Sequence, residues 1–224
     1  MPFLKLPTVL PVFPLTGCIL LPGNWLPLHV FEPRYRALVS DVLAGDRIMG
    51  MIQPLVPATD NAGPAEGGEE DPDLYAVGCA GVIVHALPEP DGRYHILLKG
   101  ESRFRVQREA QKLRGYRRLE VSYQAFQGDP CEMGQVLDPS RILRALQVLK
   151  DSHSLSIDPD DFRNLGGVAI LNGLSAALPF TPGEKQALLE AAGIQHRERL
   201  LLGLMALGFG HGTGSRFVPP STIH

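Results

Sequence analysis

One glycine pair in the sequence has the spacing of a phosphate-binding loop. Gly63 and Gly68 lie as far apart as the glycines of that loop, and Glu69 and Glu70 follow. The loop needs a lysine and a hydroxyl residue at these two positions, to hold phosphate and Mg²⁺. Two carboxylates would instead repel a nucleotide, so we predict no nucleotide site here.

Two other segments loosely match catalytic or phosphate-binding patterns. Ser175 lies in Gly173–Ala177, which is similar to a nucleophile elbow, but that motif needs a sharp turn from strand to helix and this segment has a helical pattern. The glycine-rich segment 208–214 has no strand before it and no helix after it. We interpret Ser175 as a packing residue and the segment as part of a flexible tail. The sequence predicts no catalytic residue.

Metal ligands and paired thiols also lack a local pattern. Cys18, Cys79 and Cys131 are far apart, and the seven histidines form no pair with ligand spacing. Zinc sites usually show such local pairs. We therefore predict no metal, no cofactor and no disulfide framework, as is typical of a reducing compartment.

The segment Leu15–Cys18 matches a bacterial lipoprotein cleavage box. Pro7, Pro11 and Pro14 interrupt the apolar helix that a signal peptide needs, since each interior proline costs about 3 kcal/mol. No stretch approaches the ~20 apolar residues of a membrane span. We expect a cytoplasmic protein without membrane contact.

A basic segment stands out against the weak overall charge of −3. Between Arg93 and Arg118 there are nine basic residues against two acidic ones, a local excess of seven positive charges. Such a stripe could follow a phosphate backbone. The favoured interpretation is a solvated face, or one neutralised by the acidic segment 57–73, which we interpret as a solvated insertion without function.

The elements that would position these residues change character along the chain. The 224 residues, 44% of them hydrophobic, suffice for one large domain or two small ones sharing an interface. Residues 1–128 read as mostly β, with one amphipathic helix at about 33–44. Residues 129–210 read as a helical bundle, and 211–224 as a flexible tail.

Several local signals fix the expected elements. Prolines in 9–15 and 26–30 favour edge strands. Strands are expected over 48–53, 75–87, 93–98, 104–106 and 119–126. Asp138-Pro139 and Asp158-Pro159 open helices, 168–178 is an apolar helix, Thr181–Glu184 is a capping box, and a last helix contains Leu200–Leu207.

Several segments together resemble the amino-terminal, substrate-binding domain of Lon proteases. The similarity covers nearly the whole chain in order, and Pro27–Arg36 (PLHVFEPRYR) is its most specific part. The other segments are Pro11–Leu15, Leu20–Gly23, Gly78–Ile83, Asp91–Tyr94, Lys99–Val106, Leu174–Leu178, Lys185–Glu190 and Arg197–Leu200.

The resemblance implies an α+β fold, a PUA-like β pseudo-barrel followed by a small C-terminal helical bundle. It implies a non-catalytic module that recognises unfolded or extended protein segments, as an adaptor for proteolysis or quality control beside a separate bacterial protease. Because the chain ends at His224 and shows no nucleotide loop, we expect neither ATPase nor peptidase activity.

The candidate binding residues are Trp25, Phe31, Glu32, Arg34, Tyr35 and Arg103. For the motif residues we prefer a structural interpretation. Glu32 would accept N–H groups at the helix start, Arg34 would pair with it or with a carbonyl, Phe31 and Tyr35 would pack in the core, and Arg103 would brace a turn. For Trp25, a core position and an interaction surface remain equally open.

Two alternatives stay open. The first is an RNA-binding PUA-like protein that uses Arg105, Arg108 and Arg114 as its nucleic-acid face. The second, ranked last, is an enzyme whose site is assembled between the β and α parts.

Overall fold

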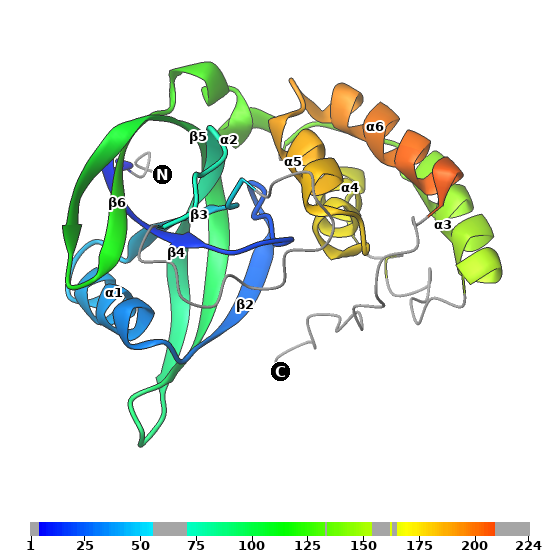
Figure 1. Cartoon of the computed structure of the whole chain (residues 1–224). Coiled ribbons are helices and arrows are strands. Elements are labelled where there is room, and N and C mark those ends of the chain that lie inside the picture. The colour runs from blue at the N-terminus through cyan, green and yellow to red at the C-terminus, as the bar shows by residue number, and fades with distance from the viewer. Residues whose placement is uncertain (1–4, 56–70, 133, 154–161, 163–164, 209–224) are drawn as a thin grey trace.

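The computed structural model describes residues 5–55, 71–132, 134–153, 162 and 165–208, which form a mixed α/β structure (Figure 1). Six strands belong to one sheet: β1 (Val9–Pro14), β2 (Trp25–Val30), β3 (Ile48–Ile52), β4 (Val77–Pro88), β5 (Tyr94–Leu113) and β6 (Tyr116–Ser122). The helices in this part of the chain are α1 (Pro33–Leu43), the 3-10 turn η1 (Gln124–Phe126), α2 (Asp129–Glu132), α3 (Ser140–His153), α4 (Gly167–Ala177), α5 (Pro182–Glu190) and α6 (Ile194–Leu207).

The strand pairings form a closed circuit. From β5 they run through β4, β3, β1 and β6 and return to β5. The 20-residue strand β5 closes the circuit because its first half pairs with β4 and its second half with β6. Strand β2 stands outside the circuit and pairs along its whole length with residues 94–99 of β5.

The sequence predicted most strands, but three expectations were wrong. The strand expected over 119–126 is β6, which ends at Ser122, and Gln124–Phe126 form the 3-10 turn η1. The segments 93–98 and 104–106 belong to one continuous strand, β5, rather than two. In the order of the strands β1 lies between β3 and β6 and not at the edge of the sheet. It pairs with β6 at Val9–Pro11 and with β3 at Val12–Pro14. Each half pairs along one side only, which explains how the strand accommodates prolines that lack an N–H. The edge position expected for β2 is confirmed within the described strands.

Two apolar cores result from this arrangement. The smaller one lies among the strands of the circuit and includes Leu10, Ile48 and Phe104, all almost fully buried. The larger one joins the sheet to the helices, from Phe13 beside α1 to Leu171 on α4. In Figure 1 helices α3–α6 lie together on one side of the strands, and α6 contacts α3, α4 and α5.

Local helix signals are largely confirmed. Helix α1 begins at Pro33, as the sequence predicts, and Thr181 caps α5 in a complete capping box with Glu184. Helix α5 ends at Glu190. Most of the short helix expected between Asp158-Pro159 and Gly166-Gly167 lies outside the described residues, as does the tail 211–224. None of the helices in the described part combines the length and apolar character needed to cross a membrane.

Buried polar side chains connect the strands to the helices. Arg103 on β5 is 2% exposed. Its guanidinium donates to the Asp129 carboxylate at 2.6 Å and to the carbonyls of Leu189 and Ala191 at 3.0 and 2.6 Å. Asp129 also accepts the Arg103 backbone N–H at 2.7 Å. A single strand residue thereby holds both α2 and the end of α5.

A second buried arginine continues the connection within the helices. Arg197 on α6 is fully buried and donates to Asn172 on α4 at 2.8 Å and to the Leu188 carbonyl at 3.1 Å. Asn172 in turn donates to the carbonyl of Pro22, just before β2, at 3.1 Å. The buried Glu132 carboxylate joins the two arginines, at 3.6 Å from Arg103 and 3.4 Å from Arg197, and we call the set Arg103, Asp129, Glu132, Asn172 and Arg197 the buried polar network.

Replacing Arg103 by methionine should destabilise the protein strongly. Arg103→Met leaves the buried Asp129 carboxylate without its cation, and removing one partner of a buried ion pair costs about 3–5 kcal/mol. Urea unfolding should report this loss in the free energy of unfolding. Arg108→Met is the matched control on the same strand, because Arg108 and its partner Glu120 are exposed. Equal losses for both variants would contradict the role assigned to Arg103.

The three thiols should react at very different rates. Burial raises the pKa of Cys18 to about 11, against the opposing charge of Lys185. Burial raises the pKa of Cys79 further, with Asp129 adding to the effect. Since the thiolate is the reactive form, both should react slowly at pH 8 with a disulfide reagent. The exposed Cys131 should supply one fast equivalent that Cys131→Ser removes, and three equally fast thiols would contradict the structure.

Candidate functional site

Strand β2 presents large apolar side chains to solvent at both of its ends. The side chains alternate, so that Leu26, Leu28 and Val30 face the core while the residues between them face outward. Trp25 at the start of β2 is 51% exposed, and Phe31 just after its end is 60% exposed. Two large aromatic side chains are therefore exposed close to the two ends of one strand, and apolar side chains that gather into a patch there would mark a binding surface.

The neighbouring strands extend this apolar surface. Pro27 on β2 is exposed and lies opposite Leu97 on β5. Leu87 on β4, which pairs with His95 on β5, is 55% exposed. We call the set Trp25, Pro27, Phe31, Leu87 and Leu97 the outer face. It borders the free edge of β2, which among the described strands pairs only with β5.

The turn before β2 is fastened to β5. Gly23 donates to the carbonyl of Gly100 at 2.9 Å, and Gly100 donates to the carbonyl of Asn24 at 2.8 Å. Any side chain at Gly100 would overlap the carbonyl of Leu21, so this close approach requires glycine. Trp25 therefore projects from a held backbone rather than from a loose loop.

A cleft of about 490 Å³ adjoins the start of β2, at the boundary between strands and helices. Its surface is mostly apolar, and its polar side chains are an ion pair between Lys99 and Glu101 at 3.1 Å, the buried Asp129, and Ser102, Tyr123 and Gln127. The hydroxyl of Tyr123 in the wall donates to the Pro7 carbonyl at 2.9 Å, and burial raises its pKa. No histidine is among the described residues that line the cleft, and Asp129 is held by Arg103. This chemistry suits an apolar side chain better than a reaction.

Some of the roles expected for the residues around the start of α1 agree with the structure, and others do not. Arg34 pairs with Glu32 at 3.1 Å, as expected, and Tyr35 is buried and stacks on Phe13 at 4.2 Å between ring centroids. The Glu32 side chain makes no capping hydrogen bond, because its carboxylate accepts from Arg34 instead. The expected core position of Phe31 is wrong, since the chain leaves the sheet there with the ring outside.

The positions of Trp25 and Arg103 also differ from those expected. The core position considered for Trp25 is wrong, because half of its side chain is exposed. Arg103 does brace the structure, but between β5 and the helices rather than at a turn. Its burial takes it out of reach of a ligand at the surface.

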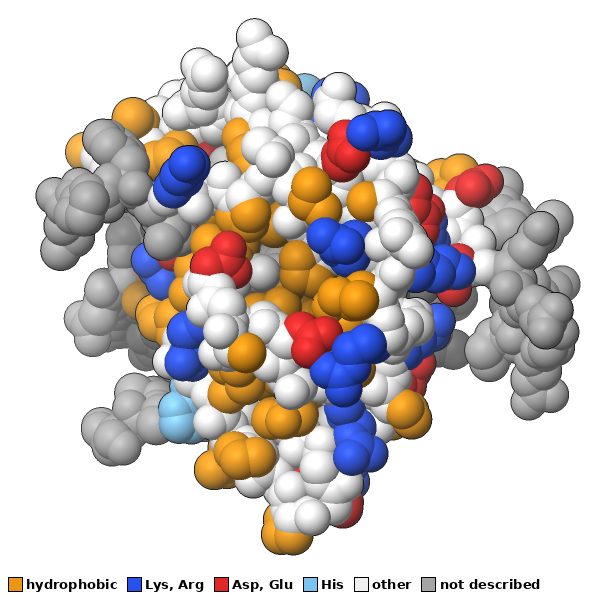
Figure 2. Space-filling model, turned by 90° about the vertical axis from the view of Figure 1, so that its left-hand side faces the viewer, with side chains coloured by type: hydrophobic (Ala, Val, Ile, Leu, Met, Phe, Trp, Pro, Cys, Tyr) orange, Lys and Arg blue, Asp and Glu red, His pale blue; other side chains and the backbone are white. Residues whose placement is uncertain are grey.

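The basic segment is neutralised by carboxylates. Seen from the side of β6 and α1, basic side chains stand next to acidic ones (Figure 2). Arg108 pairs with Glu120 at 2.6 Å and Arg114 with Asp41 at 2.6 Å, whereas Arg105 has no ion pair among the described residues. A phosphate would have to displace these carboxylates, so the nucleic-acid face is not favoured.

The acidic segment contributes to this neutralisation. Asp71 lies within 4 Å of the cationic groups of Arg34, Lys112 and Arg117. A hydrogen bond from Lys112 and these positive charges lower its pKa. Residues 57–70 of the segment lie outside the described part of the chain.

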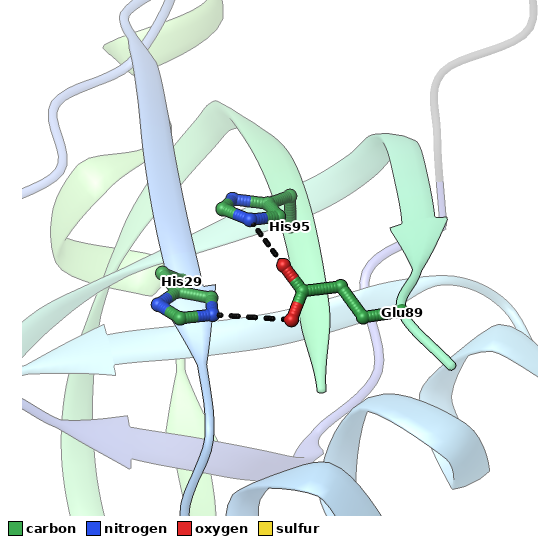
Figure 3. Close-up of side chains that lie close together, drawn as sticks. All are labelled: His29, Glu89 and His95. Carbon is green, nitrogen blue, oxygen red and sulfur yellow. Dashed lines mark hydrogen bonds and ion pairs between the residues drawn. The ribbon is translucent and has the colours of Figure 1, made fainter. Parts of the chain in front are cut away.

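One cluster of titratable side chains was not predicted from the sequence. His29 on β2, His95 on β5 and Glu89 in the turn between β4 and β5 point toward one another (Figure 3). Strand pairing places the two histidines directly opposite each other, although they are 66 positions apart. Only the strand register, which no short motif encodes, brings this set together.

The comparisons with known proteins agree with one another. The family model for the ATP-dependent protease La (LON) substrate-binding domain matches residues 9–206. The Lon protease of Flavobacterium johnsoniae is 27% identical over 201 residues, which cover 86% of this chain and 23% of that protein. Lon protease 2 of Myxococcus xanthus is 26% identical over 89% of this chain and 24% of its own length. The chain thus spans about a quarter of the length of these relatives.

Solved structures show the same fold. A Lon N-terminal domain protein from Xanthomonas campestris is 28% identical, covers 88% of this chain and 99% of its own, and has a TM-score of 0.60. The N-terminal domain of a Mycobacterium avium complex Lon protease, 18% identical with a TM-score of 0.54, supports the fold alone. The match to the family model over most of the chain shows that it belongs to the family of Lon substrate-binding domains.

Proposed function

We propose that the chain recognises extended, apolar segments of other proteins through the outer face and the adjoining free edge of β2. The observation that carries this proposal is the exposure of Trp25 and Phe31 at the two ends of an edge strand. In a domain of the Lon substrate-binding family, such a surface suits a protein substrate.

The geometry fits a segment in an extended conformation. Six residues at roughly 3.3 Å each place Trp25 and Phe31 about 20 Å apart along one strand. A bound strand of similar length could pair with the free edge while its alternate side chains rest on the outer face. Pro27 removes one N–H donor from β2, which limits indiscriminate pairing with other strands.

The cleft beside Trp25 offers a place for an anchoring side chain. Its mostly apolar walls adjoin the outer face at Gly23 and Lys99, the residue opposite Trp25. Tryptophan at a pocket edge supplies a large rigid contact area at little entropic cost. We therefore expect a preference for segments that carry a large apolar residue flanked by residues able to adopt a β conformation.

We also propose that the fold has two parts. The closed circuit of β1, β3, β4, β5 and β6 supports a PUA-like pseudo-barrel, and the contacts among α3–α6 support a small helical bundle. We place the boundary of the two parts at residues 128 and 129. We further propose that the module acts in the cytoplasm, as an adaptor that presents unfolded segments to a separate protease.

Removing either exposed aromatic side chain should weaken binding to a permanently unfolded protein. We expect Trp25→Ala and Phe31→Ala each to raise the Kd for reduced, carboxymethylated lactalbumin about tenfold, or ~1.4 kcal/mol, because each deletes a large anchor from the outer face. Fluorescence anisotropy of the labelled lactalbumin measures this Kd directly.

The matched control is Val148→Ala on α3, where Val148 is 66% exposed and distant in sequence from β2. This variant should bind as the parent does. The proposal fails if the folded parent does not bind the unfolded protein, or if all three variants bind with the parent Kd. Salt-sensitive binding of a single-stranded RNA, lost in Arg105→Gln, would favour the nucleic-acid alternative instead.

A further inference from the structure

The side chains of His29, Glu89 and His95 lie together at the base of the β4–β5 hairpin (Figure 3). A nitrogen or oxygen atom from each residue lies within 4.8 Å of the other two. The Glu89 carboxylate is 2.7 Å from Nε2 of His95 and 3.8 Å from Nε2 of His29. The cluster is separate from the buried polar network and from the cleft.

The backbone holds all three side chains in place. His29 and His95 are direct cross-strand neighbours, and their rings stack at 4.4 Å between centroids with an interplanar angle of 9°. Glu89 begins a tight turn in which its N–H donates to the Arg93 carbonyl at 2.8 Å and its carbonyl accepts from Gly92 at 2.9 Å. Gly92 has a φ of +82°, which favours glycine at this point of the turn.

We propose that His29, Glu89 and His95 bind a first-row divalent cation such as Zn²⁺. Two imidazoles and one carboxylate form a ligand set that zinc prefers, whereas Mg²⁺ and Ca²⁺ prefer oxygen ligands alone. Three protein ligands leave the fourth tetrahedral position to water. The proposal concerns the cation alone and stands independently of the proposed protein recognition.

The distances are compatible with a tetrahedral cation. Ligand bonds of about 2.1 Å place the ligand atoms of a tetrahedral site about 3.4 Å apart. The two carboxylate–imidazole distances, 2.7 and 3.8 Å, lie on either side of this value. Because the two stacked rings are nearly parallel, both imidazoles have to rotate about their side-chain bonds before their nitrogens face one ion.

The surroundings of Glu89 also leave a role for a cation. Its Oε2 atom is buried and accepts no hydrogen bond among the described residues. The Nε atom of Arg93 lies 2.8 Å from this oxygen, but also 2.6 Å from the carboxylate of Asp91. A metal ion can thus displace Arg93 from Glu89 without leaving the guanidinium unpaired.

Isothermal titration with ZnCl₂ tests the site. The chain is freed of any affinity tag, treated with EDTA and dialysed, and carries Cys131→Ser because the exposed Cys131 thiol could bind zinc itself. We expect one saturable site per chain. His29→Asn, His95→Asn and Glu89→Gln should each weaken binding at least about tenfold, since each removes one ligand. The two histidines are exposed and Glu89 is half-buried, so circular dichroism must show that each variant keeps the parent fold.

His85→Asn is the matched control, because His85 is exposed on β4 outside the cluster and should leave the affinity unchanged. As a second readout, Zn²⁺ should shift the NMR signals of the His29 and His95 rings and not those of His85. The inference is overturned if the parent shows no saturable zinc binding, or if His95→Asn binds zinc as tightly as the parent.

Discussion

The ion pair between Arg103 and Asp129 ties the sheet to the helices. It joins the longest strand to the helices where water is excluded, and the same guanidinium satisfies two carbonyls at the end of α5. A buried pair of this kind contributes little net stability over apolar packing, but its loss is costly, because the remaining charge has no partner. It therefore fixes the orientation of the helices relative to β5. Asn172 extends the constraint to the chain just before β2.

This constraint determines what β2 can present. The strand pairs only with β5 among the described strands, so its second edge and outward side chains stay available. Trp25 and Phe31 extend from a backbone that the buried polar network and the turn at Gly100 hold in place, and little ordering entropy remains to be lost on binding. His29 lies between them on the same strand, with its ring centroid 6.0 Å from that of Phe31. A cation at the cluster would border the surface proposed for protein segments.

Local sequence patterns predicted the elements whose causes are local. The stripe of apolar residues with Pro33 predicted α1, and Thr181 with Glu184 predicted the capping box. Features that depend on distant residues were not predictable in this way. Prolines in 9–15 favoured an edge strand, whereas β1 changes partner midway and has two neighbours. Phe31 resembled a core residue because its type is usually buried. The cluster around Glu89 depends on the register of β2 and β5, which no motif records.

Hydrogen exchange with and without an unfolded protein tests directly whether the domain binds extended segments at β2. Carboxymethylated lactalbumin should slow the exchange of amides within 25–31 and leave α6 unchanged, because a strand paired with the free edge shields that backbone alone. Slower exchange confined to α3–α6, or no change anywhere in a complex that demonstrably forms, would show that the segment does not bind at β2.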